Sequence, residues 1–121
     1  MATPSQPGSY PERLPKIGAN SQNLAAAQPE VMKAFAELYR STGSAGALDS
    51  KTKELIALAI SVAVRCDDCI AFHVHAAFGN GASREEIADA LGVAVLMGGG
   101  PSMIYAGHAI DAVDQFMERA A

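Results

Sequence analysis

The sequence predicts an all-α protein, on three observations. Apolar residues recur at helical spacing through most of the chain after residue 28. Helix start and stop signals, such as Pro29 and Gly79-Asn80-Gly81, divide this part into segments of helical length. No segment alternates apolar and polar residues in the way that a half-buried strand does. We therefore expect about five main helices after an extended N-terminal arm.

Residues 1–26 are expected to form this arm and to be partly disordered. Prolines at high density block helix formation and favour extended chain, and four stand here: Pro4, Pro7, Pro11 and Pro15. The first ten residues are expected to be mobile. Three apolar residues would let the later part lie along the body or a neighbouring subunit: Tyr10, Leu14 and Ile17. A flexible leader is the alternative.

The first helix is expected over residues 29–41. Pro29 suits the first helical position and Glu30 suits the first turn. An apolar face at helical spacing predicts a structural role: Val31, Phe35, Leu38 and Tyr39. The second helix should begin at Asp49 or Ser50 and run to Arg65, and its apolar middle predicts burial on several sides.

The third helix is expected over residues 67–78, before the Gly79-Asn80-Gly81 stop. A capping box that begins at Ser83 opens the fourth, and the last runs over residues 101–119. His75 and His108 are interpreted as surface or interface residues. Gly98-Gly99-Gly100 is interpreted as a tight turn, because no strand precedes it and no P-loop Lys-Ser/Thr follows.

Composition limits the class of protein. With 121 residues the chain allows one domain, which we place at residues 27–121. Half of the residues are hydrophobic and only 18% are charged. Because the interior of so small a domain cannot hold all of this apolar surface, we expect a homo-oligomer. Three apolar residues on outer faces of the fourth helix suggest a subunit contact: Val93, Leu96 and Met97.

Charge and hydropathy predict where the protein acts. A net charge of −4 without a basic cluster argues against nucleic acid and anionic membranes as partners. No apolar run approaches transmembrane length, and the N-terminus lacks the apolar core of a signal peptide, so we expect a cytoplasmic protein. Two cysteines three residues apart in a reducing compartment indicate catalytic or metal chemistry.

The chemistry concentrates in residues 51–75. Cys66 and Cys69 form a C-x-x-C, and His73 follows Cys69 by four residues, on the same face of a helix. A thiol at a helix start and beside an imidazole is a candidate thiolate. If the second and third helices form a hairpin that turns near Cys66, Glu54 comes within about a helix turn of His73, close enough for one bridging water. Such a line of groups could relay protons. A solvated Glu54 in the first turn is the alternative.

The spacing E-x11-C-x-x-C-x3-H resembles the signature of AhpD-like alkylhydroperoxidases, in the carboxymuconolactone decarboxylase superfamily. The resemblance covers about residues 30–117. It implies an all-helical AhpD-like fold, obligate oligomers (a trimer, or a hexamer built from trimers), and an antioxidant dithiol that reduces peroxides or partner disulfides. It also implies that Cys69 attacks, Cys66 resolves, and Glu54 and His73 relay protons. An external dithiol, such as a lipoyl-bearing protein, restores the thiols, and no cofactor is expected.

One departure concerns the position before the second cysteine. The best-studied members have a histidine there, and this chain has Asp68. Asp67 and Asp68 place two negative charges beside the sulfurs, and like charges disfavour ionisation of a thiol. We therefore expect a less acidic thiol that acts better as a dithiol reductant than as a fast peroxidase.

Three other functions are weighed against this one. Lactone decarboxylation or related acid–base chemistry occurs in the superfamily's other branch, which typically lacks the cysteine pair. A metal site is the second, since Cys66, Cys69, His73 and Glu54 are acceptable zinc ligands, although the usual knuckle glycine is missing. The third is an assembly module without chemistry.

Overall fold

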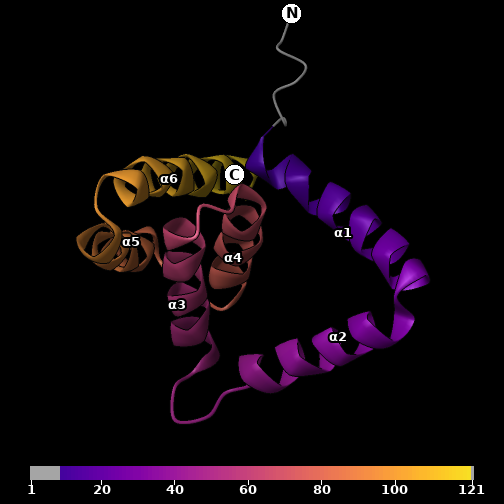
Figure 1. Cartoon of the computed structure of the whole chain (residues 1–121). Helices are drawn as coiled ribbons and strands as arrows, with labels where there is room; N and C mark the ends of the chain where they lie inside the picture. Colours follow the sequence, from indigo (N-terminus) through magenta and orange to yellow (C-terminus); the bar gives the residue numbers. More distant parts are fainter. Residues whose placement is uncertain (1–8, 121) are drawn as a thin grey trace, which may run out of the picture.

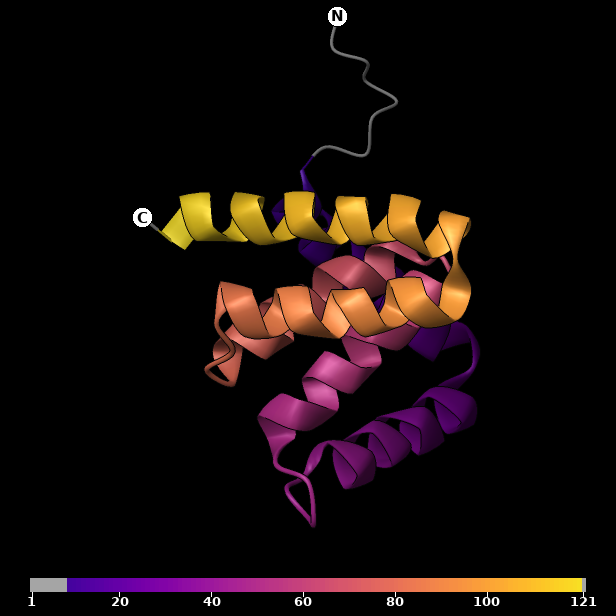
Figure 2. The same ribbon diagram turned by 90° about the vertical axis from the view of Figure 1, so that its left-hand side faces the viewer.

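The computed structural model describes residues 9–120, and within this range the chain forms six helices and no strand, which confirms the all-α prediction. Their bounds are α1 (Tyr10–Ala27), α2 (Pro29–Gly43), α3 (Ser50–Ala63), α4 (Asp67–Gly79), α5 (Arg84–Gly98) and α6 (Gly100–Ala120). In Figure 1, α3 and α4 stand side by side at the centre, and α1 and α2 form a V beside them. Figure 2 shows α5 and α6 running alongside each other as a second hairpin.

The core lies between the α3–α4 hairpin and the α5–α6 hairpin. Its largest fully buried apolar side chains come from four helices: Leu58, Val62, Ile70, Val74, Ile87 and Val113. They follow the helical spacing of the sequence, so each helix turns one apolar stripe inward. The packing fixes α3 against α4, and these two helices carry the site described below.

The extended arm is wrong for the residues that the structure describes, because residues 10–27 form helix α1. Pro11 stands in the first turn, where its missing N–H costs nothing, and Glu12 accepts the N–H of Ser9 at 3.2 Å. After Pro15 no proline interrupts the helix, and tertiary contacts stabilise its start: the N–H of Tyr10 donates to Oε1 of Gln115 at 2.6 Å. The expectation of mobility for residues 1–8 lies outside the described residues.

The later part of this segment lies along the body of the protein. This was one of two alternatives, and the other was a flexible leader. Tyr10 is buried, and Leu14 packs against the core. Helix α2 differs, because none of its residues is buried and its contacts with α3 are few. The apolar face expected on this helix is therefore left mostly uncovered within one chain: Val31, Phe35 and Leu38 are each more than half exposed.

The three glycines at the junction of α5 and α6 form the expected tight turn: Gly98 ends α5, Gly99 connects the helices and Gly100 begins α6. Gly99 has a φ of 70°, a backbone conformation that favours glycine. A Cβ on Gly98 would collide with the side chain of Ser102, so this position also needs glycine. Across residues 9–120, no helix combines the length and the apolar character needed to cross a bilayer.

Candidate active site

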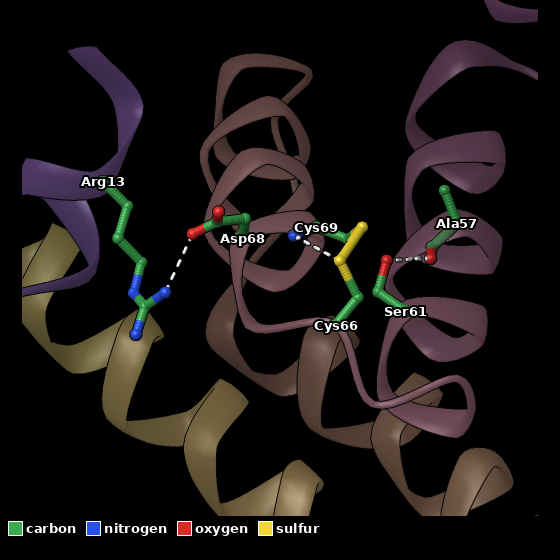
Figure 3. The surroundings of a disulfide bond; sticks show 6 residues. All are labelled: Arg13, Ala57, Ser61, Cys66, Asp68 and Cys69. Carbon is green, nitrogen blue, oxygen red and sulfur yellow. Dashed lines mark hydrogen bonds and ion pairs between the residues drawn. A yellow bond between two sulfur atoms is a disulfide. The ribbon is translucent and has the colours of Figure 1, made fainter. Parts of the chain in front are cut away.

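Both cysteines lie at the N-terminus of α4, where the chain turns sharply out of α3. Arg65 takes a left-handed conformation (φ 60°) in this turn, and the N–H of Cys66 donates to the carbonyl of Ser61 at 3.1 Å. Cys66 is the N-cap residue, and its Sγ accepts the N–H of Cys69 at 3.1 Å. The two sulfurs are joined in a disulfide, with the Cα atoms 5.2 Å apart (Figure 3). Both sulfurs therefore lie where the helix dipole favours a thiolate after reduction.

Glu54 and His73 meet across the α3–α4 hairpin. Nδ1 of His73 lies 2.7 Å from Oε1 of Glu54, and the side chains are only 20% and 10% exposed. The prediction that the hairpin brings them together is confirmed, with direct contact in place of the bridging water that the sequence allowed. A solvated Glu54 is wrong, because the residue is 8% exposed. A short, sheltered carboxylate–imidazole pair can fix the orientation of the imidazole.

Tyr39 of α2 is a site residue that the sequence did not reveal. Its hydroxyl donates to Oε2 of Glu54 at 3.4 Å, and its ring contacts that of Phe72, which in turn contacts His73 edge to face. Burial, followed by the nearby charge of Glu54, raises the pKa of Tyr39 above its ordinary value. The sequence placed Tyr39 on a structural apolar face; its hydroxyl was the one available signal.

A pocket of about 360 Å³ lies beside Cys69, between α1, α2 and α4. Cys69 and His73 line it together, as their spacing of four residues predicted. Most of its other lining is apolar or aromatic: Ile17, Met32, Phe35, Ala36, Tyr39 and Phe72. A second pocket of about 300 Å³, between α2 and α3, is lined by Glu54, Tyr39 and His73. His73 thus lines both pockets, and Glu54 lines one of them.

The two aspartates of the motif both have partners. Arg13 of α1 forms an ion pair with Asp68, with Nη1 at 2.8 Å from Oδ1. Oδ1 of Asp67 accepts the hydroxyl of Tyr10 at 2.8 Å and lies 3.0 Å from Nδ1 of His108. Burial, followed by this hydrogen bond, raises the pKa of the Tyr10 phenol. His108 therefore has a specific partner, a role that its position on a polar stripe did not reveal.

His75 and the candidate metal ligands lie as follows. His75 is exposed and lies against the ring of Phe116, with the ring centres 5.5 Å apart, which agrees with a surface residue. Within residues 9–120, no three or more His, Cys, Asp or Glu side chains are grouped so as to hold a metal ion. The four-ligand set that the sequence allowed is therefore not assembled.

Relatives of the chain include two uncharacterised bacterial proteins. One, from Cupriavidus necator, is 40% identical over 98 residues, which are 81% of this chain and 87% of the relative. The other, from Paracoccus denitrificans, is named as uncharacterised protein 4 in the cox locus. It is 34% identical over 102 residues, 84% of this chain and 92% of the relative.

Solved structures share the fold. A carboxymuconolactone decarboxylase family protein from Legionella pneumophila has a TM-score of 0.81 and 44% identity, over 84% of this chain and 90% of its own. A family member from Thermotoga maritima, with a suggested involvement in antioxidative response, has a TM-score of 0.69 and 38% identity, over 73% and 91%. The sequence model of the family matches residues 29–112. The chain therefore belongs to the carboxymuconolactone decarboxylase family.

Proposed function

We propose that the protein is a thiol–disulfide oxidoreductase of the AhpD type, whose Cys66–Cys69 dithiol reduces a peroxide or a partner disulfide. The observation that carries the proposal is the arrangement of the site. A cysteine pair spaced for a reversible disulfide stands at a helix N-terminus, and a sheltered Glu54–His73 pair shares a pocket with Cys69. Family membership agrees with this chemistry, and the antioxidative role suggested for the Thermotoga maritima relative points the same way.

The reaction starts from the reduced dithiol. The Cys69 thiolate attacks one peroxide oxygen, the O–O bond breaks, and the leaving oxygen takes a proton, which gives a sulfenic acid and an alcohol or water. Sγ of Cys66 then attacks Sγ of Cys69, water leaves, and the disulfide closes. An external dithiol reduces this disulfide by exchange and is itself oxidised. Because the chain has two cysteines, each turnover needs this reductant.

His73 and Glu54 supply proton transfer in this cycle. Nδ1 of His73 faces Glu54, so Nε2 is the ring nitrogen that can exchange a proton with the Cys69 side of the pocket. The carboxylate of Glu54 holds the ring in this tautomer and stabilises the imidazolium when it forms. Cys69 is assigned the attack because it lines the pocket, and Cys66 resolves from the N-cap position.

The apolar lining of the pocket suits a substrate with an apolar part. An alkyl hydroperoxide could place its chain against Phe35, Met32 and Phe72 while its oxygens reach Cys69. The hydrocarbon arm of a lipoyl group has the same character and ends in a dithiol, so we propose a lipoyl-bearing protein as the reductant. Burial of apolar groups contributes to binding in either case.

We further propose that the protein acts as a trimer or a hexamer in the cytoplasm. Large apolar side chains remain uncovered around the α5–α6 turn of the single chain: Val93, Leu96, Met97, Met103 and Ile104. Leu96 and Met97 are each 79% exposed, and a concentration of exposed apolar side chains in one part of the chain favours a site of association. Sedimentation at micromolar concentration should give an oligomer, and a stable monomer would rule this out.

The test of the chemistry is peroxide consumption that depends on a dithiol, measured for wild type, Cys66→Ser and Cys69→Ser. We expect Cys69→Ser to abolish both turnover and sulfenic acid formation. Cys66→Ser should still form the sulfenic acid, which dimedone traps, but should not turn over. If both variants consume peroxide at the wild-type rate, or if wild type is inactive with peroxide and with disulfide substrates, the proposed function is wrong.

A further inference from the structure

Helix α1 lies before residues 29–112, the part of the chain that the family model matches, yet it contacts the redox motif. Figure 3 shows Arg13 reaching from α1 to the carboxylate of Asp68, in the first turn of α4. The ion pair measures 2.8 Å, and the Arg13 side chain is 16% exposed while that of Asp68 is 56% exposed. The guanidinium also lies over the ring of Tyr10, at 4.9 Å from its centre. These contacts hold the cation in place.

Asp68 is the charged group nearest in sequence to Cys69, and both residues line the same pocket. Because the two residues are adjacent in the chain and both line one pocket, a free carboxylate on Asp68 would oppose a thiolate on Cys69. An arginine stays charged at every pH at which a thiol titrates, so Arg13 offsets this carboxylate throughout that range.

Several other titratable groups around the motif bind one another, and Arg65, directly before Cys66, is an exposed cation. On one side, Asp67 binds Tyr10 of α1 and His108 of α6. On the other side, the charged or titratable groups are His73 of α4, Glu54 of α3 and Tyr39 of α2, which bind one another. The residues that α1 adds to the pocket, Ile17 and Ser21, are uncharged.

We propose that Arg13 is a positioning residue of the redox site: it offsets the charge of Asp68 and so keeps the Cys69 thiol able to ionise near neutral pH. The inference rests on the proposed function in taking Cys69 as the reactive thiol. It makes α1 a part of the site, although this helix precedes the family match. It also modifies the expectation drawn from the sequence, in which no residue of the N-terminal segment offset the repulsion from Asp68.

The test is the rate of iodoacetamide alkylation against pH, measured on reduced protein in a Cys66→Ser background so that Cys69 alone reports. Arg13→Gln should raise the apparent pKa of the thiol and slow alkylation at neutral pH by about threefold to tenfold, because the Asp68 charge is then uncompensated. Arg13→Lys keeps a cation and should stay within about twofold of the parent. Asp68→Asn should speed alkylation, and the double variant with Arg13→Gln should return near the parent rate.

The matched control is Arg84→Gln. It removes the same charge from a surface ion pair between α5 and α6, where Arg84 lies 3.0 Å from Asp114, and it should leave the alkylation profile unchanged. An unchanged apparent pKa in Arg13→Gln, or a shift in Arg13→Lys as large as in Arg13→Gln, would overturn the proposal. If Arg13→Gln does not fold, Asp68→Asn decides, since its side chain is half exposed: no acceleration there overturns the proposal. Alkylation needs no peroxide, so failure of the proposed function would be seen separately.

Discussion

Two parts of the fold contribute to one site in different ways. One is the α3–α4 hairpin, and the other is the pair of helices α1 and α2, called the α1–α2 arm from here on. The hairpin is the buried centre of the fold and carries both sulfurs together with Glu54 and His73. The arm is largely exposed, and α2 buries no residue. Even so, α1 supplies Arg13, α2 supplies Tyr39, and each helix forms one wall of the pocket. In the proposed mechanism, the buried hairpin holds the reacting groups, while α1 and α2 supply a counter-charge and part of the pocket wall.

The largest expected effect concerns the hairpin. Glu54→Gln and His73→Ala should each slow oxidation of the thiols by about 10²- to 10⁴-fold without unfolding the protein, because both side chains serve proton transfer and neither is an apolar core residue. Stopped-flow oxidation by a hydroperoxide measures the rate, and circular dichroism checks the fold. His75→Ala is the control: this exposed histidine lies on the same helix and should leave the rate unchanged. Full activity in either relay variant would remove that residue from the mechanism.

The sequence predicted the hairpin and the meeting of Glu54 with His73 because both depend on local spacing. The spacing of four from Cys69 to His73, and the turn at Cys66, fix which side chains share a face once the helices pair. The apolar run after Glu54 likewise predicted a buried α3, and the structure agrees. For such features, periodicity and helix signals suffice, since few alternatives keep the same apolar residues inside.

The arm depends on contacts between residues far apart in the sequence, which spacing does not reveal. Pro11 and Pro15 predicted extended chain, but Pro11 stands in the first turn, where a proline is compatible with a helix, and α1 continues through Pro15. The hydrogen bond between Tyr10 and Gln115 holds the start of α1 in place. The ion pair of Arg13 with Asp68 spans 55 positions, and the contact of Tyr39 with Glu54 needs the observed placement of α2. Neither could be found without the tertiary structure.

The second largest effect is expected on the free energy of unfolding, which should fall much more for a truncation in the α3–α4 hairpin than for one in α2. Leu58 of α3 is fully buried, and Leu58→Ala should lower the free energy of unfolding by about 2–5 kcal/mol through lost burial and a cavity. Leu38 of α2 is 57% exposed, and Leu38→Ala should cost less than about 0.5 kcal/mol. Denaturant titration monitored by circular dichroism measures both. A loss at Leu38 as large as that at Leu58 would mean that a subunit contact covers α2, and the contrast between the regions would then fail for the assembly.

A smaller effect is expected from Tyr39→Phe, which removes the hydroxyl that the arm donates to Glu54. The hydrogen bond is long, at 3.4 Å, so we expect the rate of thiol oxidation to fall by less than about tenfold. The raised pKa of Tyr39 means that its proton is retained to higher pH than in a free tyrosine. The reduction should therefore be the same from pH 6 to pH 9. A loss that appears only over part of this range would contradict the view that Tyr39 acts as a protonated donor throughout it.

The smallest expected effect follows from replacing Asp68 by the histidine of the best-studied relatives. Asp68→His removes the negative charge next to Cys69 and adds an imidazole, so it should lower the apparent pKa of the thiol and speed peroxide reduction. Because Arg13 already offsets Asp68 at 2.8 Å, the gain should be modest, about threefold.

Alkylation against pH for Asp68→His and Asp68→Asn separates two reasons for such a gain. Loss of the charge alone predicts equal shifts of the apparent pKa in both variants. A part in proton transfer predicts that peroxide reduction speeds up further in the histidine variant while the alkylation profiles coincide. An apparent pKa that is unchanged or raised in Asp68→His would contradict the electrostatic account. In that case the α1–α2 arm would contribute the walls of the pocket and not the charge balance of the motif.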